Sequence, residues 1–263
     1  MIRRSTLSLF VITFVLSISM SSCRSSGALK SDRSAESFEF KASKVAASSL
    51  LSHIGASSLR SVKGKARVAF SSPELSERGV ADFMSDEIHS FARLRNGIGI
   101  EGAQILVDAD SVLSYFVFDR TAWKFSILEY ETRPEIKLRL PLNLLQMIRP
   151  MIYVDDVVFV EENADSYKIH LKNKTEIILH KTSLLPQYVR LESSLSDRFT
   201  EFRYEAYAQI SGTFLPRRIQ ATTADRESRI QFDIIELEIN PDRLQFGVNI
   251  PASVPIFRFK NEL

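Results

Sequence analysis

The chain has 263 residues, of which 44% are hydrophobic and 25% are charged, enough to build one sizeable core. It carries 34 lysines and arginines against 32 aspartates and glutamates, and Arg3 and Arg4 account for this small excess. Without those two residues the net charge is zero, which removes the electrostatic case for nucleic-acid binding. The single cysteine, Cys23, excludes a fold held by internal disulfides.

Residues 1–22 have the pattern of a secretion signal. Arg3 and Arg4 precede an apolar stretch, residues 7–20, which is short for a membrane span and is followed by Ser21, Ser22 and Cys23. The ending Met-Ser-Ser-Cys resembles the lipobox of bacterial lipoproteins, although Met20 replaces the usual leucine. That resemblance implies cleavage between Ser22 and Cys23 and attachment of acyl groups such as palmitate to Cys23. A plain secretory signal with an incidental thiol is the alternative.

Residues 23–42 are rich in serine and charge and predict a flexible tether, and residues 43–263 then form a single domain. Apolar residues at helical spacing predict a first helix over residues 44–60, with Ser43 as its N-cap. A second, short apolar helix is expected over residues 141–149, with Pro141 at its first position. It needs an apolar surface to cover.

From Val62 onward the hydrophobic period changes to two, which indicates β-strands. Later alternating stretches are residues 167–171, 202–210, 215–223 and 228–239, and Ala206 falls on the apolar face of its strand. The alternation slips between Ile234 and Ile235, which predicts a β-bulge there. About ten or eleven strands joined by short polar turns indicate a mainly β, antiparallel fold with one face exposed to water.

Two patterns that could carry chemistry are better explained as structure. Gly97, Gly99 and Gly102 match a nucleotide-binding spacing, but strand-like sequence follows them where a helix is required, so we expect a turn. His170 and His180 flank one hairpin at positions that do not face each other, so no metal site is expected. We therefore expect no cofactor and no enzyme active site.

The aromatic content is more informative, because 18 phenylalanines accompany a single tryptophan. Many fall on strand faces, where they fill a closed core or line an apolar cavity in a curved sheet, and the pattern leaves both alternatives open. The candidate cavity-lining residues are Val68, Phe70, Phe116, Phe118, Phe202, Tyr204 and Phe232.

Across residues 43–255 the chain resembles the LolA/LolB-like superfamily of lipoprotein-localisation factors. The resemblance rests on the lipobox and tether, the single N-terminal helix, residues 62–68 (VKGKARV), residues 102–123, the Leu140-Pro141-Leu142 helix entry, and residues 246–251 (FGVNIP). It implies a half-open barrel of about eleven strands with a helical lid, which holds acyl chains in its cavity. In the anchored members of that family a loop projects an apolar residue toward the membrane. The matching loop is residues 96–102, with Ile98 or Ile100 as the projecting residue.

The leading hypothesis is therefore an outer-membrane lipoprotein, facing the periplasm, that binds acyl chains or lipidated proteins and assists lipoprotein localisation. Arg24 after Cys23 favours the outer membrane, since an aspartate there marks inner-membrane retention in some bacteria. A soluble periplasmic carrier is an implied partner. The alternatives are a structural or stress-sensing interaction module, for which the cavity would be filled, and an envelope enzyme, for which no convergent polar residues are found. An open cavity of a few hundred Å³ favours the first.

Overall fold

The computed structural model describes residues 39–55, 59–132, 143–150, 154–193, 195 and 198–258. These residues belong to one compact unit, Glu39–Leu263. The predicted signal, residues 1–22, lies outside the described residues. So do the predicted lipidation site Cys23 and the predicted helix start Pro141. No helix among the described residues is long and apolar enough to cross a membrane.

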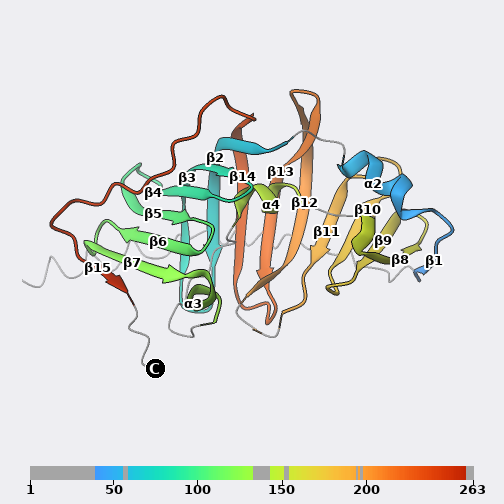
Figure 1. Ribbon diagram of the computed structural model, residues 1–263, viewed down its shortest axis with the longest axis horizontal. Helices are drawn as coiled ribbons and strands as arrows, with labels where there is room; N and C mark the ends of the chain where they lie inside the picture. Colours follow the sequence, from blue (N-terminus) through green and yellow to red (C-terminus); the bar gives the residue numbers. More distant parts are fainter. Residues whose placement is uncertain are drawn as a thin grey trace, which may run out of the picture. The chain divides into compact units, whose positions relative to one another are not determined.

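Fifteen strands of the described residues form one sheet, in the order β1-β8-β9-β10-β11-β12-β13-β14-β2-β3-β4-β5-β6-β7-β15 (Figure 1). Neighbouring strands are antiparallel, except that β15 runs parallel to β7. The sheet is open, because β1 and β15 are its two edges. The expected mainly β, antiparallel and open architecture is confirmed, with more strands than the eleven expected. The strands are β1 Lys41–Ala42, β2 Ser61–Ser71, β3 Ser76–Asp86, β4 Ser90–Asn96, β5 Glu101–Val107, β6 Ser111–Phe116, β7 Thr121–Ser126, β8 Val157–Glu162, β9 Ser166–Leu171, β10 Glu176–His180, β11 Pro186–Arg190, β12 Phe199–Ile210, β13 Thr213–Thr223, β14 Arg229–Ile239 and β15 Ile256–Arg258.

One face of this sheet is apolar over most of its width. Because directly paired residues share a face, the pairing register can be followed across the strands. It leads from Val160 on β8 through β9 to β14 and then to Phe70 on β2. The residues of this row are Val160, Ile169, Ile177, Val189, Phe202, Ala221, Ile230 and Phe70.

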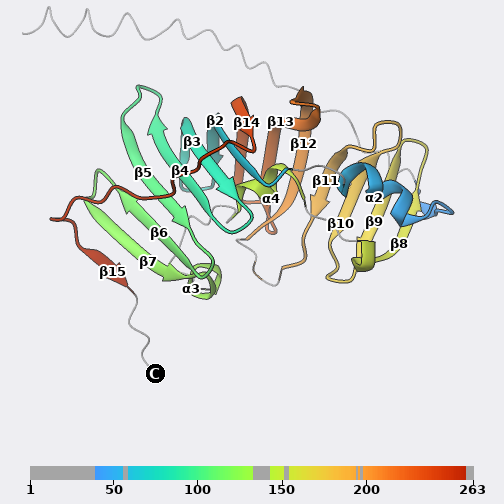
Figure 2. The ribbon, with the colours of Figure 1, turned by 45° about the horizontal axis from the view of Figure 1, so that its top comes forward.

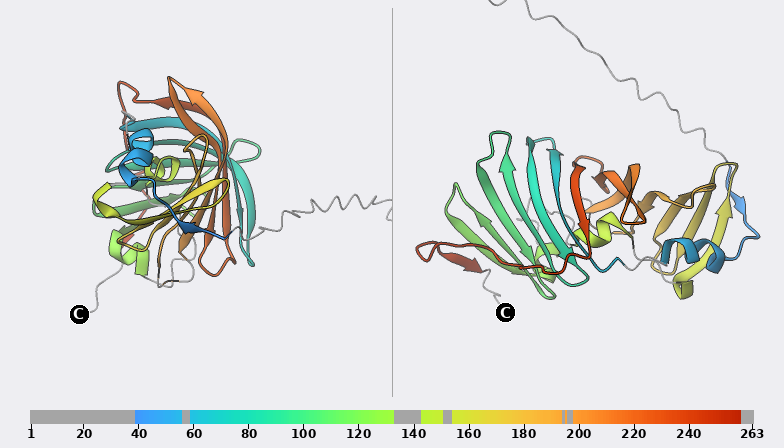
Figure 3. Two further views of the ribbon diagram at one scale, coloured as in Figure 1. Left: turned by 90° about the vertical axis from the view of Figure 1, so that its right-hand side faces the viewer. Right: turned by 90° about the horizontal axis from the view of Figure 1, so that it is seen from above.

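The three α-helices of the described residues, α2 Ala47–Gly55, α3 Ile127–Thr132 and α4 Leu144–Ile148, lie on this same side of the curved sheet (Figure 3). A 3₁₀ turn, Val154–Asp156, precedes β8. Leu50 and Leu51 of α2 and all four buried residues of α4 join the main core cluster. Tyr130 of α3 packs with Val107, Val112 and Phe125. The helices therefore cover parts of the apolar face.

The predicted helix ends are wrong in detail. The first helix begins at Ala47, and Ser43 does not cap it. Instead the Ser43 N–H donates to the Val160 carbonyl (2.9 Å), and its hydroxyl accepts from the Val45 N–H (3.1 Å), so the chain is still tied to β8 here. The second helix begins at Leu144 with Asn143 as N-cap, and Arg149 lies just beyond its end.

Two strands depart from simple alternation. On β14 the register shifts between Ile234 and Glu236, and Ile235 is 38% exposed while Ile234 is 7% exposed, which confirms the predicted bulge. On β12 the expectation for Ala206 is wrong. Ala206 has φ +54° and is exposed, and the next residue, Tyr207, packs against the core instead. The left-handed backbone at this one position interrupts the alternation.

The opposite face of β5–β7 is covered by the C-terminal segment, residues 240–255. The Asn249 N–H donates to the side-chain oxygen of Gln104 (2.9 Å), and Val254 is buried with Tyr115 and Ala122. This segment ends in β15 beside β7. The C-terminal segment and the helices therefore cover opposite faces of the sheet.

The close approach at Gly64 makes a testable stability prediction. A methyl group on Gly64 would collide with the carbonyl oxygen of Glu236 at the bulge and would lie 2.8 Å from Phe83 Cζ. We expect Gly64→Ala to lower the free energy of unfolding by about 1–3 kcal/mol, because backbone and core must shift. Gly97→Ala is the control, since no atom lies within 4 Å of its added methyl. Equal urea midpoints for the two variants would contradict the packing described.

Candidate functional site

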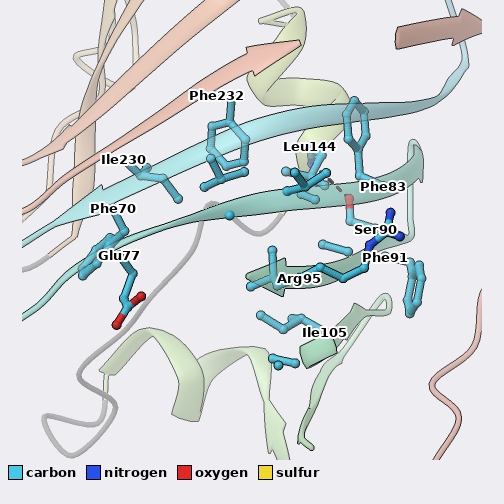
Figure 4. Close-up of a pocket in the computed structure, with 18 of the residues that line it drawn as sticks. Phe70, Glu77, Phe83, Ser90, Phe91, Arg95, Ile105, Leu144, Ile230 and Phe232 are labelled. Atoms are coloured by element: carbon cyan, nitrogen blue, oxygen red, sulfur yellow. Dashed lines mark hydrogen bonds between the residues drawn. The ribbon is translucent and has the colours of Figure 1, made fainter. Parts of the chain in front are cut away.

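An apolar pocket of about 430 Å³ lies on the helix-bearing face of β14, β2, β3, β4 and β5. Leu144, Met147 and Ile148 of α4 and Tyr130 of α3 contribute to its wall. Figure 4 shows Phe70, Ile230 and Phe232 near one another and Leu144 beside Ser90. The strand residues on this face that line the pocket are Val68, Phe70, Glu77, Gly79, Ala81, Phe83, Ser90, Ala92, Leu94, Asn96, Ala103, Ile105, Val107, Ile230, Phe232 and Ile234.

The hollow arises from side-chain size. Gly79 and Ala81 of β3, Ala92 of β4 and Ala103 of β5 all lie on the pocket face, where Ala81 and Ala103 flank Leu94. Larger side chains on β2 and β14, among them Phe70 and Phe232, stand beside them. Small residues in the middle of an otherwise bulky sheet face leave space that the sheet itself cannot fill.

The inner end of the pocket is closed by α4, which is held by two buried serines of the β3–β4 hairpin. The Ser90 hydroxyl accepts from the Leu144 N–H (3.0 Å) and the Ser85 hydroxyl from the Leu145 N–H (3.1 Å). The two hydroxyls also contact each other at 2.5 Å. Asn143, as N-cap, accepts from the Gln146 N–H (2.9 Å). A helix of five residues is unstable alone, so these bonds and its buried side chains fix it in place.

The outer end of the pocket is formed by three hairpin turns. In an antiparallel meander alternate turns lie at the same end, here the β2–β3, β4–β5 and β6–β7 turns; Figure 2 shows the last two away from α3. Each carries an exposed apolar side chain: Leu75, Ile98 (81% exposed) with Ile100, and Phe118 (65% exposed). Leu75 and Phe118 also line the pocket. We call these four residues the apolar rim.

The glycine-rich stretch is a turn. Asn96 and Ile100 close it by a backbone hydrogen bond (2.9 Å), and the Asn96 side chain accepts from the N–H groups of Ile98 (3.1 Å) and Ile100 (2.9 Å). Gly99 has φ +87°, a conformation that favours glycine. Strand β5 follows directly, so the arrangement needed for nucleotide binding is not present here.

The turns at the other end of these strands are acidic. Asp86 ends β3 and Glu87 follows it in the turn to β4, and Asp108 and Asp110 lie between β5 and β6. Burial alone would raise the pKa of Asp86, but the N–H groups of His89 (2.6 Å) and Ile88 (2.8 Å) donate to its carboxylate and hold the pKa below its usual range. The two ends of the meander thus differ in chemistry.

The structure separates the residues that the sequence grouped as cavity lining. Val68, Phe70, Phe118 and Phe232 line the pocket. Phe202 and Tyr204 do not line it, and instead are buried in the core cluster on β12, where burial raises the pKa of Tyr204. Phe116 is on the helix-bearing side of β6 but also does not line it.

Sequence reasoning missed the pocket floor on β3–β5. The signal was present as small residues in alternation, namely Gly79 and Ala81, Ala92, and Ala103, with Ile105 two residues on. Phe118 was expected in a strand, but β6 ends at Phe116 and Phe118 falls in the turn.

The two histidines of the β9–β10 hairpin lie apart, since His170 pairs with Glu176 and His180 with Ser166. His170 Nε2 is 2.8 Å from Glu161 Oε2. In the part of the chain that the structure describes, no group of three or more histidine, cysteine or acidic side chains is placed to hold a metal ion.

The sequence matches no known protein family and no curated protein. Among solved structures, a LolA superfamily protein from Nitrosomonas europaea is similar, with a TM-score of 0.50 and 14% identity over 75% of this chain and 96% of that one. A DUF1329 family protein from Desulfovibrio piger gives 0.49 and 10%, covering 73% and 90%. A putative outer membrane lipoprotein-sorting protein domain from Vibrio parahaemolyticus gives 0.45 and 10%, covering 71% and 88%. At 14% identity the first of these shows the fold alone, and the chain has the LolA-like fold that the sequence resemblance implied.

Proposed function

We propose that the protein is a lipid-anchored component of the bacterial envelope that holds acyl chains of a lipid or a lipidated protein in its pocket and assists lipoprotein localisation. The observation that carries this proposal is the apolar pocket of about 430 Å³, which opens between exposed apolar turns. Its volume is in the range of ligand sites, roughly 300–1,000 Å³. The solved structure with the same fold, described as a LolA superfamily protein, supports a role in this class.

The chemistry of the pocket suits a hydrocarbon chain. A sixteen-carbon chain exposed to water costs on the order of 13 kcal/mol, at about 0.8 kcal/mol for each CH₂ group, so a carrier must enclose it. The hydroxyls of Ser85 and Ser90 at the inner end already accept hydrogen bonds from α4. They are therefore committed to structure, and the proposed role is binding without catalysis.

The apolar rim is the part of the domain that we assign to the bilayer. Ile98 is the most exposed large apolar side chain of the described residues, and Ile100, Leu75 and Phe118 lie on the same end of the meander. An isoleucine left in water forgoes about 1.5–3 kcal/mol of burial, which insertion among lipid chains recovers. The acidic turns at the other end would be repelled by anionic lipids, and this orients the rim toward the membrane.

Filling the pocket should block binding. Ala92 lies on the pocket floor, so we expect Ala92→Trp to reduce binding of a fluorescent fatty-acid probe at least tenfold, because the indole occupies the space of the chain. The control is Ala206→Trp, at an exposed position of β12 outside the pocket. Probe binding is measured by fluorescence titration, and circular dichroism checks that each variant is folded. If both variants bind the probe as the parent does, ligand is held elsewhere.

Cys23 should carry the anchor. We expect Cys23→Ser to release the protein from membranes and to stop incorporation of labelled palmitate, because Cys23 is the single cysteine in the sequence. Fractionation at high salt distinguishes an acyl anchor from electrostatic adsorption. Continued sedimentation of the variant with membranes at high salt would place the anchor elsewhere.

The rim should act in transfer and not in folding. We expect the double variant Ile98→Glu, Ile100→Glu to keep the parent's urea midpoint, because both side chains are exposed, while transfer of bound lipid to vesicles slows by tenfold or more. The control is Phe214→Glu, an exposed aromatic on β13 away from the rim. A transfer rate equal to that of the parent would remove the membrane role of this turn.

A further inference from the structure

The row of paired residues that crosses the apolar face ends in a charge. The register continues from Ile230 to Phe70 and then to Glu77 on β3. Figure 4 shows the Glu77 carboxylate beside the ring of Phe70, at one margin of the pocket. Glu77 is exposed and forms no salt bridge with any described residue. A carboxylate thus stands where an apolar residue would continue the row.

Glu77 is also the one ionisable side chain on the pocket face of β14, β2, β3, β4 and β5. The other residues that alternate onto this face in these strands, as the structure describes them, are apolar, glycine, serine or asparagine. Arg78 and Arg95 border the pocket too, but they alternate onto the opposite face, opposite Ala69 and Val80. There Arg95 is paired with Asp82. On this face the charged group at the pocket margin is therefore the Glu77 carboxylate, while Arg78 borders the same margin from the opposite face.

The position of Glu77 coincides with the place where a ligand's polar end must remain. The inner end offers two hydroxyl groups, and both already accept hydrogen bonds from α4. Burying an unpaired polar group there would cost about 1–3 kcal/mol, and burying a charge would cost far more. A ligand therefore enters with its hydrocarbon end first. Its polar end stays at the outer margin, among Leu75, Phe118 and Glu77.

We infer that Glu77 selects the charge of the ligand's polar end, so that the pocket prefers an acyl or alkyl chain with a cationic or amine-bearing end over one that ends in a carboxylate. This inference rests on the proposed function. A carboxylate at the margin attracts an ammonium group and repels a second carboxylate. Because Glu77 is exposed, solvent screens the effect, and the expected preference is about 3- to 10-fold at low ionic strength. It should shrink as salt is added.

The test uses the full chain with Cys23→Ser, loaded with the uncharged apolar fluorophore N-phenyl-1-naphthylamine. Dodecylammonium and laurate, matched in chain length and below their micelle concentrations, compete for the pocket at neutral pH and low salt. The measured quantity is the ratio of the two inhibition constants, compared among variants so that intrinsic differences between the ligands cancel. Glu77→Gln should remove the preference for dodecylammonium, Glu77→Lys should invert it, and Glu77→Asp should retain it.

The matched control is Glu227→Gln, which removes a carboxylate from the exposed β13–β14 turn and should leave the ratio unchanged. If the parent, Glu77→Gln and Glu77→Lys all bind the fluorophore and give the same ratio of inhibition constants, the role of Glu77 is overturned. The pocket proposal would still stand. Failure of the folded parent to bind the fluorophore would overturn the proposed function itself. If the Lys variant fails to fold, the salt series on the parent decides: a ratio that does not fall with salt rejects the inference.

Discussion

The structure depends on covering one apolar face of a sheet that never closes. A closed barrel buries its interior by its own curvature, whereas a sheet with two free edges relies on what lies across it. Here the described cover consists of three short helices. They suffice over β8–β14, where Leu50 and Leu51 of α2 join the core, and α4 covers the middle of the sheet. Over β3–β5 the floor includes Gly79, Ala81, Ala92 and Ala103, and the cover formed by the described residues does not fill the space above them. The pocket is the part of the apolar face that these helices leave unfilled.

The same constraint explains why α4 is fastened by side chains of the sheet. Five residues cannot form a stable helix from their own hydrogen bonds, and the first N–H groups have no partner inside the helix. Ser85 and Ser90 supply those partners from the β3–β4 hairpin. In doing so they lose their capacity to bind a ligand's polar group. One set of hydrogen bonds therefore both closes the inner end and makes it suitable for hydrocarbon alone.

Alternation in the sequence predicted the strands and even the bulge at Ile235, because a side-chain period of two is a local property of the backbone. The family resemblance, together with the flanking glycines, also predicted that Ile98 or Ile100 would be exposed. Alternation could not place Phe202 and Tyr204. Alternation tells which face a residue occupies, but not whether a helix or open space lies across from it, and that depends on strand order. The break in alternation at Ala206 coincides with a left-handed backbone, which an alanine in the sequence does not indicate. Helix ends failed for a similar reason, because the N–H groups of α4 are satisfied by serines more than fifty residues away in the chain.

The placement of the pocket at the end of a meander has a consequence for how a ligand enters. The strands that form its floor keep full pairing on both sides, and the C-terminal segment braces the opposite face of β5–β7. Opening the sheet would break several ladder hydrogen bonds at once, whereas the outer margin is bounded by single side chains on turns. Phe118 leans over Gly102, where an added methyl group would lie 3.5 Å from its ring, and is otherwise exposed. Rotation of such a side chain is far faster than loss of strand pairing. Entry at the rim therefore needs no rearrangement of the sheet, and a chain can pass between a bilayer and the pocket across the same residues that would touch the lipid.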